Sequence, residues 1–162
     1  MIEDKTCSQR LEAYFRANRV PYQVQFHRWA DSAREVAAVE HVPEKDLAKV
    51  VMVVADGELT MVIVPATHRL DLPFVAAALG DDYVRLAREE EFAATFPDCA
   101  VGAMPPFGNL YGVPVWVDAT LTADETIVFQ AGSHTETMAI AYADFERLVH
   151  PRVATFAHRA YW

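Results

Sequence analysis

The chain has 162 residues, 52% of them hydrophobic, and its 14 basic and 23 acidic side chains give a formal net charge of −9 at pH 7. This length and apolar content predict one folded domain over residues 1–162 and exclude a disordered chain. The acidic balance disfavours a protein that holds long DNA, because a phosphate backbone requires a basic face; contact with a short nucleic-acid end stays open.

Neither a membrane segment nor a metal or cofactor motif stands out in the sequence. No apolar run approaches the ~18 residues that a membrane span needs, and no signal-peptide pattern follows Met1. The two cysteines, Cys7 and Cys99, fit no CxxC pattern and are typical of a reducing compartment, so we expect a cytoplasmic protein. The six histidines form no HxH or HxxxH pair, so we predict no metal.

The first elements are predicted from caps and periodicity. A helix is expected over residues 6–18, because Thr6 and Gln9 match a capping box and apolar residues recur at helical spacing. Three elements follow from similar signals: a strand over 22–27, a helix capped by Asp31 or Ser32 that runs to about Glu40, and a short helical turn over 44–46.

The strongest signal is a hairpin. Residues 47–55 and 58–65 are nearly continuous apolar runs, and Asp56-Gly57 joins them. Asp-Gly between two β-rich runs is typical of a tight hairpin turn. Because both runs lack polar alternation, we expect the hairpin to be buried on both faces, at the centre of a sheet under helices.

The remaining elements are predicted from turn residues, caps and apolar periodicity. They are a helix from Asp71 to Gly80, a strand over 83–86, an acidic-fronted helix over 88–96, strands over 113–118, 126–130 and 135–141, a helix over 143–149, and a mixed tail from Pro151. Helices and strands follow no regular βα order. This predicts an α+β fold with a mixed, mostly antiparallel, partly barrel-like sheet and flanking helices.

The segment 101–112, VGAMPPFGNLYG, is the first candidate site. Its Pro-Pro pair fixes the backbone and excludes a helix or a central strand. Amides at Gly102, Ala103 and Met104 would suit an oxygen or an acyl group, and a packed connector is the alternative. Cys99, just before the segment, is a candidate nucleophile or a small buried side chain.

Two further positions carry polar groups in an apolar setting. Lys49 opens the first strand of the hairpin, where it is either a snorkelling side chain or a cation that anchors an anionic or carbonyl oxygen. The turn Gly132-Ser133-His134 follows a strand, and its imidazole either positions water or a substrate hydroxyl or lies exposed in an ordinary turn.

Taken together, the lysine, the Gly-Pro loop and the Gly-Ser-His turn, in this order along the chain, resemble the YbaK and prolyl-tRNA synthetase-associated domain family of trans-editing aminoacyl-tRNA deacylases. The quoted motifs are Lys49 at the hairpin, GAMPPFG in the candidate loop and FQAGSHTE before the last strand, together with VPATHRLD and PVWVD between them. The resemblance covers about residues 11–149. It implies the family's α+β fold and a metal-free, cofactor-free hydrolysis of the ester between an amino acid and the tRNA 3′ end.

The resemblance also implies roles for individual residues. Lys49, Gly102 and His134 would be the catalytic residues. The residues that line the aminoacyl pocket would be Ala103, Met104, Pro105, Pro106, Phe107, Gly132, Ser133 and His27. Met104, the bulkiest variable residue of that wall, would limit the size of the acyl group. The partners would be the aminoacyl-tRNA 3′ end and, because the chain is acidic, an aminoacyl-tRNA synthetase or elongation factor that presents it.

The sequence departs from one branch of the family. The branch that clears cysteinyl-tRNA(Pro) has a tyrosine and a serine where this chain has Gln25 and Gln130. This shifts the expected substrate toward alanine, serine, threonine or a similar small acyl group on a tRNA(Pro)-type tRNA. Two alternatives stay open: a catalytically silent binding or regulatory module of the same fold, and a hydrolase of an ester unrelated to tRNA.

Overall fold

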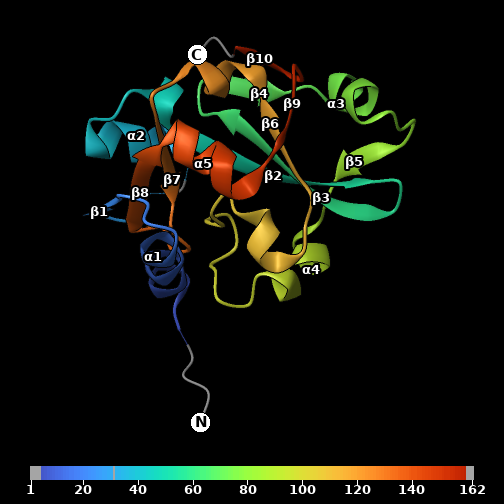
Figure 1. The fold of residues 1–162 in the computed structure, drawn as a ribbon. Coiled ribbons are helices and arrows are strands. Elements are labelled where there is room, and N and C mark those ends of the chain that lie inside the picture. The colour runs from blue at the N-terminus through green and yellow to red at the C-terminus, as the bar shows by residue number, and fades with distance from the viewer. Residues whose placement is uncertain (1–4, 31, 160–162) are drawn as a thin grey trace.

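The computed structural model describes residues 5–30 and 32–159, whose strands form three sheets with helices around them (Figure 1). The α-helices are α1 (Cys7–Ala17), α2 (Ala33–Glu40), α3 (Leu72–Leu79), α4 (Glu89–Phe92) and α5 (Tyr142–Val149). The strands are β1 (Gln23–Phe26), β2 (Ala48–Ala55), β3 (Glu58–Pro65), β4 (His68–Leu70), β5 (Val84–Leu86), β6 (Val115–Asp118), β7 (Thr126–Gln130), β8 (Glu136–Ala141), β9 (Arg152–Ala154) and β10 (Ala157–Arg159).

The predicted hairpin is confirmed. β2 and β3 pair antiparallel from Ala48 opposite Pro65 to Ala55 opposite Glu58. Asp56 and Gly57 between them have φ values of 53° and 72°, the two positive values that a type I′ turn requires. The hairpin lies in the middle of a five-stranded sheet of order β5-β2-β3-β6-β9, as expected.

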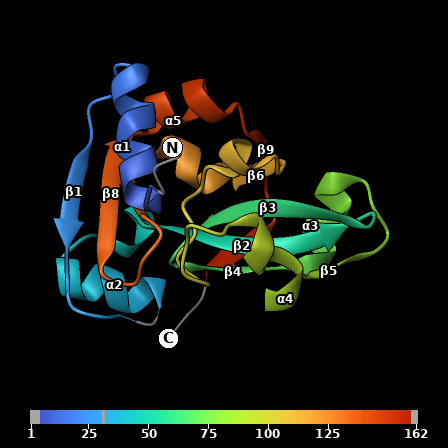
Figure 2. The ribbon, with the colours of Figure 1, turned by 90° about the horizontal axis from the view of Figure 1, so that it is seen from below.

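Figure 2 shows the two larger sheets, the five-stranded sheet and a three-stranded one. The main core lies between them. The three-stranded sheet has the order β1-β8-β7 and is antiparallel throughout. Between the sheets lie apolar side chains of α1, the hairpin, β6 to β8 and α5. At their centre Phe107, which is 0% exposed, lies with its ring centroid 5.3–5.6 Å from those of Phe15, Phe129 and Phe145. These edge-to-face contacts anchor the candidate loop in the core.

The hairpin is also covered on its other face. Val53, Val62 and Val64 pack there against Val75 of α3 and against Phe156 of the tail. The continuous apolar runs are therefore explained by burial on both faces, as predicted.

The predicted α+β class is confirmed, with corrections to its details. The described strands form three separate sheets, and the β3–β6 and β6–β9 pairs are parallel. Strands β4, β9 and β10 were not predicted, because each has only three residues and gains its stability from pairing with distant partners. The helix expected over 88–96 is α4 followed by a 3₁₀ turn, Ala93–Thr95.

The helix caps largely follow the prediction. Thr6 and Gln9 form the expected capping box of α1, Ser32 caps α2, and Asp71 and Gly80 bound α3. The alternative cap Asp31 lies outside the described residues. Over residues 5–30 and 32–159, none of the helices has the length and apolar character required to cross a membrane.

Candidate functional site

The candidate loop, residues 101–112, is buried in its middle and exposed near both ends, with Asn109 and Gly112 exposed at the far end. Val101 and Gly102 are exposed, whereas residues 103–107 are all buried. The amide of Ala103 donates to the carbonyl of Ala100 at 3.0 Å, which closes a tight turn, and Gly102 within it has φ +85°. Since the Ala103 amide is engaged and Met104 is buried, the amide of the exposed Gly102 is the donor that this end of the loop can offer to a ligand.

The turn after β7 is hydrogen-bonded directly to this loop. The amide of Ala100 donates to the carbonyl of Gly132 at 2.8 Å, and the amide of Gly132 donates to the carbonyl of Ala103 at 2.9 Å. The two segments lie side by side in Figure 2, between the two larger sheets. The structure thus brings together two segments that sequence analysis singled out and that lie about thirty residues apart in the chain.

His134 links the turn to the exposed end of the loop. Its Nε2 lies 3.0 Å from the carbonyl oxygen of Val101, so Nε2 carries the proton of the neutral ring. The other nitrogen, Nδ1, is shielded from solvent and has no hydrogen-bond partner among the described residues. A neutral imidazole in this tautomer presents Nδ1 as an acceptor, the group that a general base or a water-positioning residue requires.

Trp29 covers the His134 ring. Their ring centroids are 4.5 Å apart, and Trp29 is 60% exposed. Sequence analysis did not single out this residue. A tryptophan after a short strand is ordinarily expected to pack into the core, and only the fold places it over the histidine.

The other polar side chain of the turn shapes its backbone. The Ser133 hydroxyl lies 3.3 Å from the Thr135 hydroxyl, and it accepts a hydrogen bond from the Thr135 amide at 3.4 Å. Gly132 has φ +95° and lies against α1, where an added Cβ would be only 2.3 Å from the Cβ of Cys7. The turn therefore requires glycine at this position for both conformation and space.

Lys49, the third site that the sequence singled out, lies near the start of β2. Its ammonium donates to the carbonyl of His68 at 3.0 Å, and burial, followed by the charge of Arg69, lowers its pKa. Because side chains alternate along a strand, Lys49 leaves it on the same face as Leu47, Val51 and Val53, and the two valines belong to the cluster under α3. Leu47 packs in a small core cluster with Ala30, whose amide donates to the carbonyl of His134 at 3.4 Å. Lys49 is therefore linked to the turn indirectly, through Leu47 and Ala30, and it does not share the strand face of Ala48, Val50 and Met52, which pack in the main core with the candidate loop.

His27, which the resemblance implied as a pocket residue, is buried in the structure. Its side chain is 2% exposed, and its Nε2 lies 3.3 Å from Oε2 of Glu40 without hydrogen-bond alignment. The Thr137 hydroxyl also contacts both carboxylate oxygens of Glu40, at 2.7 and 2.8 Å. The structure therefore shows His27 as a buried partner of Glu40. Glu40 and Thr137 could not be found from sequence, because each looks like an ordinary helix or strand residue.

Replacing Thr137 by valine should test this buried group. The change keeps the side-chain shape but removes the hydrogen bond to a buried carboxylate, which should lower the free energy of unfolding by about 1–3 kcal/mol. Urea unfolding measures it. Thr122→Val is the control, since the Thr122 hydroxyl bonds at an exposed position. If the two variants lose the same free energy of unfolding, the hydrogen bond from Thr137 to Glu40 does not stabilise the fold.

Burial also changes the interpretation of Met104. It is 5% exposed and packs in the main core with Phe107, so its side chain lies in the protein interior rather than on an open wall. Ala103, Pro105 and Pro106 are buried as well. Truncating Met104 would first create a core cavity. The exposed residues of the loop beside His134 are Val101 and Gly102.

A separate cavity of about 470 Å³ lies at the tip of the hairpin. Its lining includes Asp56, Glu58, Asp81 and Asp82, and it contains none of the predicted site residues. Four carboxylates would repel a polyanion such as tRNA. For this reason we place the candidate site at the loop and the turn and not in this cavity.

The loop and turn lie within the part of the chain that matches a known family. The family model for the aminoacyl-tRNA editing domain matches residues 27–148. A search of curated proteins gives no match.

Several solved structures share the fold at low sequence identity. Hypothetical protein APE2540 superposes with a TM-score of 0.81 at 21% identity, over 91% of this chain and 99% of that one. A proposed trans-editing enzyme for prolyl tRNA synthetase gives 0.81 at 18%, over 96% and 99%. A proposed signal transduction protein from Marinobacter aquaeolei VT8 gives 0.69 at 19%, over 90% of this chain and 30% of that one.

Proposed function

This chain belongs to the aminoacyl-tRNA editing domain family, and we propose that it hydrolyses the ester bond of mischarged aminoacyl-tRNA. The observation that carries the proposal is the unpaired, solvent-shielded Nδ1 of His134, held beside the loop by the Nε2 contact with the Val101 carbonyl. An aminoacyl ester is already activated, so an enzyme needs chiefly to hold it, place a water molecule and stabilise the oxyanion.

Each part of the site has a task in this reaction. Nδ1 of His134 accepts a hydrogen bond from the attacking water or from the ribose hydroxyl beside the ester. The amide of Gly102 is the donor for the carbonyl oxygen as it gains charge. Water adds to the carbonyl carbon, the bond to the ribose oxygen breaks, and a proton passes to that oxygen. The free amino acid and the tRNA leave.

Lys49 and Arg69 supply positive charge to an otherwise acidic chain. The pKa of Lys49 is lowered partly by Arg69, so the two cations act on the same region. A terminal phosphate of tRNA would be attracted to such a pair, and this attraction is local because salt screens charges beyond ~10 Å. The net charge of −9 in turn favours presentation of the substrate by a synthetase or an elongation factor.

The lowered pKa of Lys49 predicts the alkaline limit of the reaction. A lysine is charged below its pKa, so this ammonium is lost at a lower pH than the ordinary 10.5. The catalysed rate, after subtraction of hydrolysis in buffer, should fall as pH rises through that range. Lys49→Arg should keep its charge and hold the rate to higher pH. If both proteins lose activity over the same pH range, another group sets the limit.

Trp29 offers a stacking surface for the last base of the tRNA. Base–aromatic stacking is worth about 1–3 kcal/mol, so Trp29→Ala should raise KM about 10-fold with a smaller change in kcat. Tyr83→Ala is the matched control, because Tyr83 is 85% exposed and directly precedes β5, which lies across the molecule from β1 and α2 in Figure 1. A KM that Trp29→Ala leaves unchanged would remove this tryptophan from the binding surface.

The finer substrate assignment is a small amino acid on a tRNA(Pro)-type tRNA. It is supported by the family resemblance, by Gln25 and Gln130 at the positions that differ from the cysteine-clearing branch, and by the fold shared with a proposed trans-editing enzyme for prolyl tRNA synthetase. A loop stiffened by two prolines suits selection by exclusion of larger groups.

A deacylation screen tests the substrate assignment. tRNA(Pro) charged with alanine, serine, threonine or cysteine is compared with cognate prolyl-tRNA(Pro), and alanyl-tRNA(Ala) tests the dependence on tRNA. The expected result is fast release of alanine, serine or threonine and slow release of proline. Fast release of proline would contradict editing, and release from simple amino-acid esters alone would favour a hydrolase unrelated to tRNA.

A further inference from the structure

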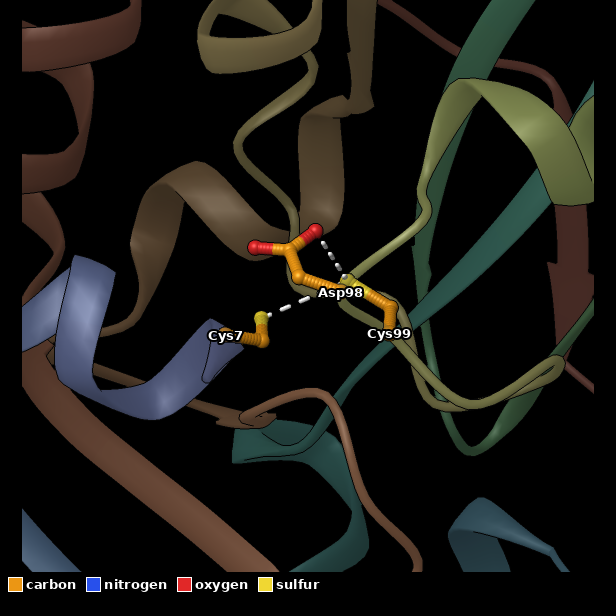
Figure 3. A group of neighbouring side chains, drawn as sticks. All are labelled: Cys7, Asp98 and Cys99. Atoms are coloured by element: carbon orange, nitrogen blue, oxygen red, sulfur yellow. Dashed lines mark hydrogen bonds between the residues drawn. The ribbon is translucent and has the colours of Figure 1, made fainter. Parts of the chain in front are cut away.

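The two cysteines lie 92 positions apart in the chain and meet behind the candidate site. Cys7 begins α1, and Cys99 precedes the candidate loop; their sulfur atoms are 3.3 Å apart (Figure 3). Both thiols are free. Sequence spacing gave no hint of this contact.

The surroundings of the two thiols differ. Cys7 is 3% exposed, whereas Cys99 is only partly buried. The hydrogen bond with Cys7 lowers the pKa of Cys99, and the same bond raises the pKa of Cys7. The Tyr111 hydroxyl lies 3.5 Å from the Cys99 sulfur. Cys99 is thus the more accessible thiol and the one that ionises first. Cys7 lies next to it as a neutral thiol that is shielded from solvent.

A metal site is the competing interpretation of this cluster. Asp98 lies next to the thiols, and one ligand atom from each of Cys7, Asp98 and Cys99 falls within 4.8 Å of the others. However, both oxygens of Asp98 accept from the Tyr111 hydroxyl, at 3.0 and 3.1 Å. The Arg10 guanidinium also lies 3.7 Å from Asp98 and 4.7 Å from the Tyr111 ring centre. A carboxylate already engaged beside a fixed cation is a poor ligand for a divalent metal.

We propose that Cys99 is a peroxide-oxidation site and that Cys7 resolves it into an intramolecular disulfide. The Cys99 thiolate attacks hydrogen peroxide, the O–O bond breaks, and sulfenic acid and hydroxide form; the hydroxide takes up the proton that the Cys99 thiol released and becomes water. The Cys7 sulfur then attacks the Cys99 sulfur; the S–S bond forms, the S–O bond breaks, and hydroxide leaves with the Cys7 proton as water. The two thiols lose two electrons in total, and peroxide becomes two water molecules.

This crosslink reaches the candidate site through two short connections. Cys99 is two residues from Val101, and Gly132 packs directly on Cys7. A disulfide shortens the sulfur separation from 3.3 Å to about 2.05 Å, so the two side chains must turn toward each other and pull on α1 and on the segment before the loop. Displacements of about 1 Å can change rates 10²-fold. The expectation that oxidation alters deacylation rests on the proposed function; the crosslink itself does not.

Titration of the reduced protein with hydrogen peroxide tests the crosslink. Free thiols should fall from two to none, the mass should drop by two hydrogens, and a non-reducing digest should join the peptides of Cys7 and Cys99. The melting temperature should rise by about 10 °C, because the crosslink closes a long loop, and dithiothreitol should reverse the change. Cys7→Ser should stop at a sulfenic acid that dimedone traps, whereas Cys99→Ser should leave Cys7 unreacted.

Three results would overturn the proposal: disulfides only between chains, irreversible over-oxidation of Cys99 in the wild-type protein, or one equivalent of tightly bound zinc that requires both cysteines and blocks oxidation. Deacylation by the reduced and oxidised forms is measured separately. If the wild-type protein forms the crosslink but shows no deacylase activity in either form, the proposed function is wrong and the proposed oxidation site still stands.

Discussion

Replacing Lys49 by alanine should lower kcat/KM for deacylation by about 100-fold or more, the effect of removing one charge-stabilising group from an active site. The free energy of unfolding should change by less than about 1 kcal/mol, because the ammonium contributes one hydrogen bond, to the His68 carbonyl, and its charge is partly desolvated. Steady-state deacylation and urea unfolding of the same preparation measure the two quantities.

Lys45→Ala is the matched control for this change. Lys45 lies four residues earlier, is 67% exposed at its side chain and pairs with Asp46 and Asp124. Its removal subtracts the same formal charge without touching the region near the turn. Equal losses in the two variants would mean that net charge, rather than the position of Lys49, governs the rate.

Gly132→Ala should have the largest effect on structure. The added Cβ would lie 2.3 Å from the Cβ of Cys7 and 2.6 Å from its sulfur, and φ at this position is +95°. Overpacking costs about 1–3 kcal/mol, and a strained backbone conformation adds about 1–3 kcal/mol. Since α1 or the turn must move, we expect a loss of stability of several kcal/mol and of deacylation together.

Gly112→Ala separates the cost of the strained backbone from the cost of the steric clash. Gly112 also has a positive φ, +70°, but an added Cβ meets no atom within 4 Å. This variant therefore carries the backbone cost alone and should lose only about 1–2 kcal/mol, with deacylation retained. Denaturant unfolding of both variants gives the comparison. If Gly132→Ala costs no more than Gly112→Ala, the contact between the turn and α1 is loose.

The elements that sequence predicted well are those with strong local signals. Asp56-Gly57 specifies the hairpin turn, Thr6 and Gln9 specify the start of α1, and Asp71 with Gly80 bounds α3. Each signal acts through neighbouring residues, so it needs no knowledge of the fold.

What sequence could not provide depends on contacts between distant segments. The β10–β4 pair joins residues that are almost ninety positions apart, and neither strand has a pattern of its own. The Cys7–Cys99 contact, the stacking of Trp29 on His134 and the burial of His27 against Glu40 arise in the same way.

The candidate site was predictable from local sequence in part and depends on distant contacts in part. Local composition singled out the loop and the Gly132–His134 turn, and the structure joins them by two backbone hydrogen bonds. The direction of the Met104 side chain could not be inferred, because Pro-Pro fixes the backbone of the loop without saying which face meets the core. Phe107, which fills the centre of the core, decides that direction.

Single-turnover hydrolysis of alanyl-tRNA(Pro) tests the central claim most directly. The protein is added in excess over the charged tRNA, and released alanine is followed against the same reaction in buffer and against Lys49→Ala. We predict release at least about 100-fold faster than in buffer with the wild-type chain, and close to the buffer rate with the variant. Binding of the charged tRNA without faster release, or with protection of its ester, would contradict the account and identify a silent binding module.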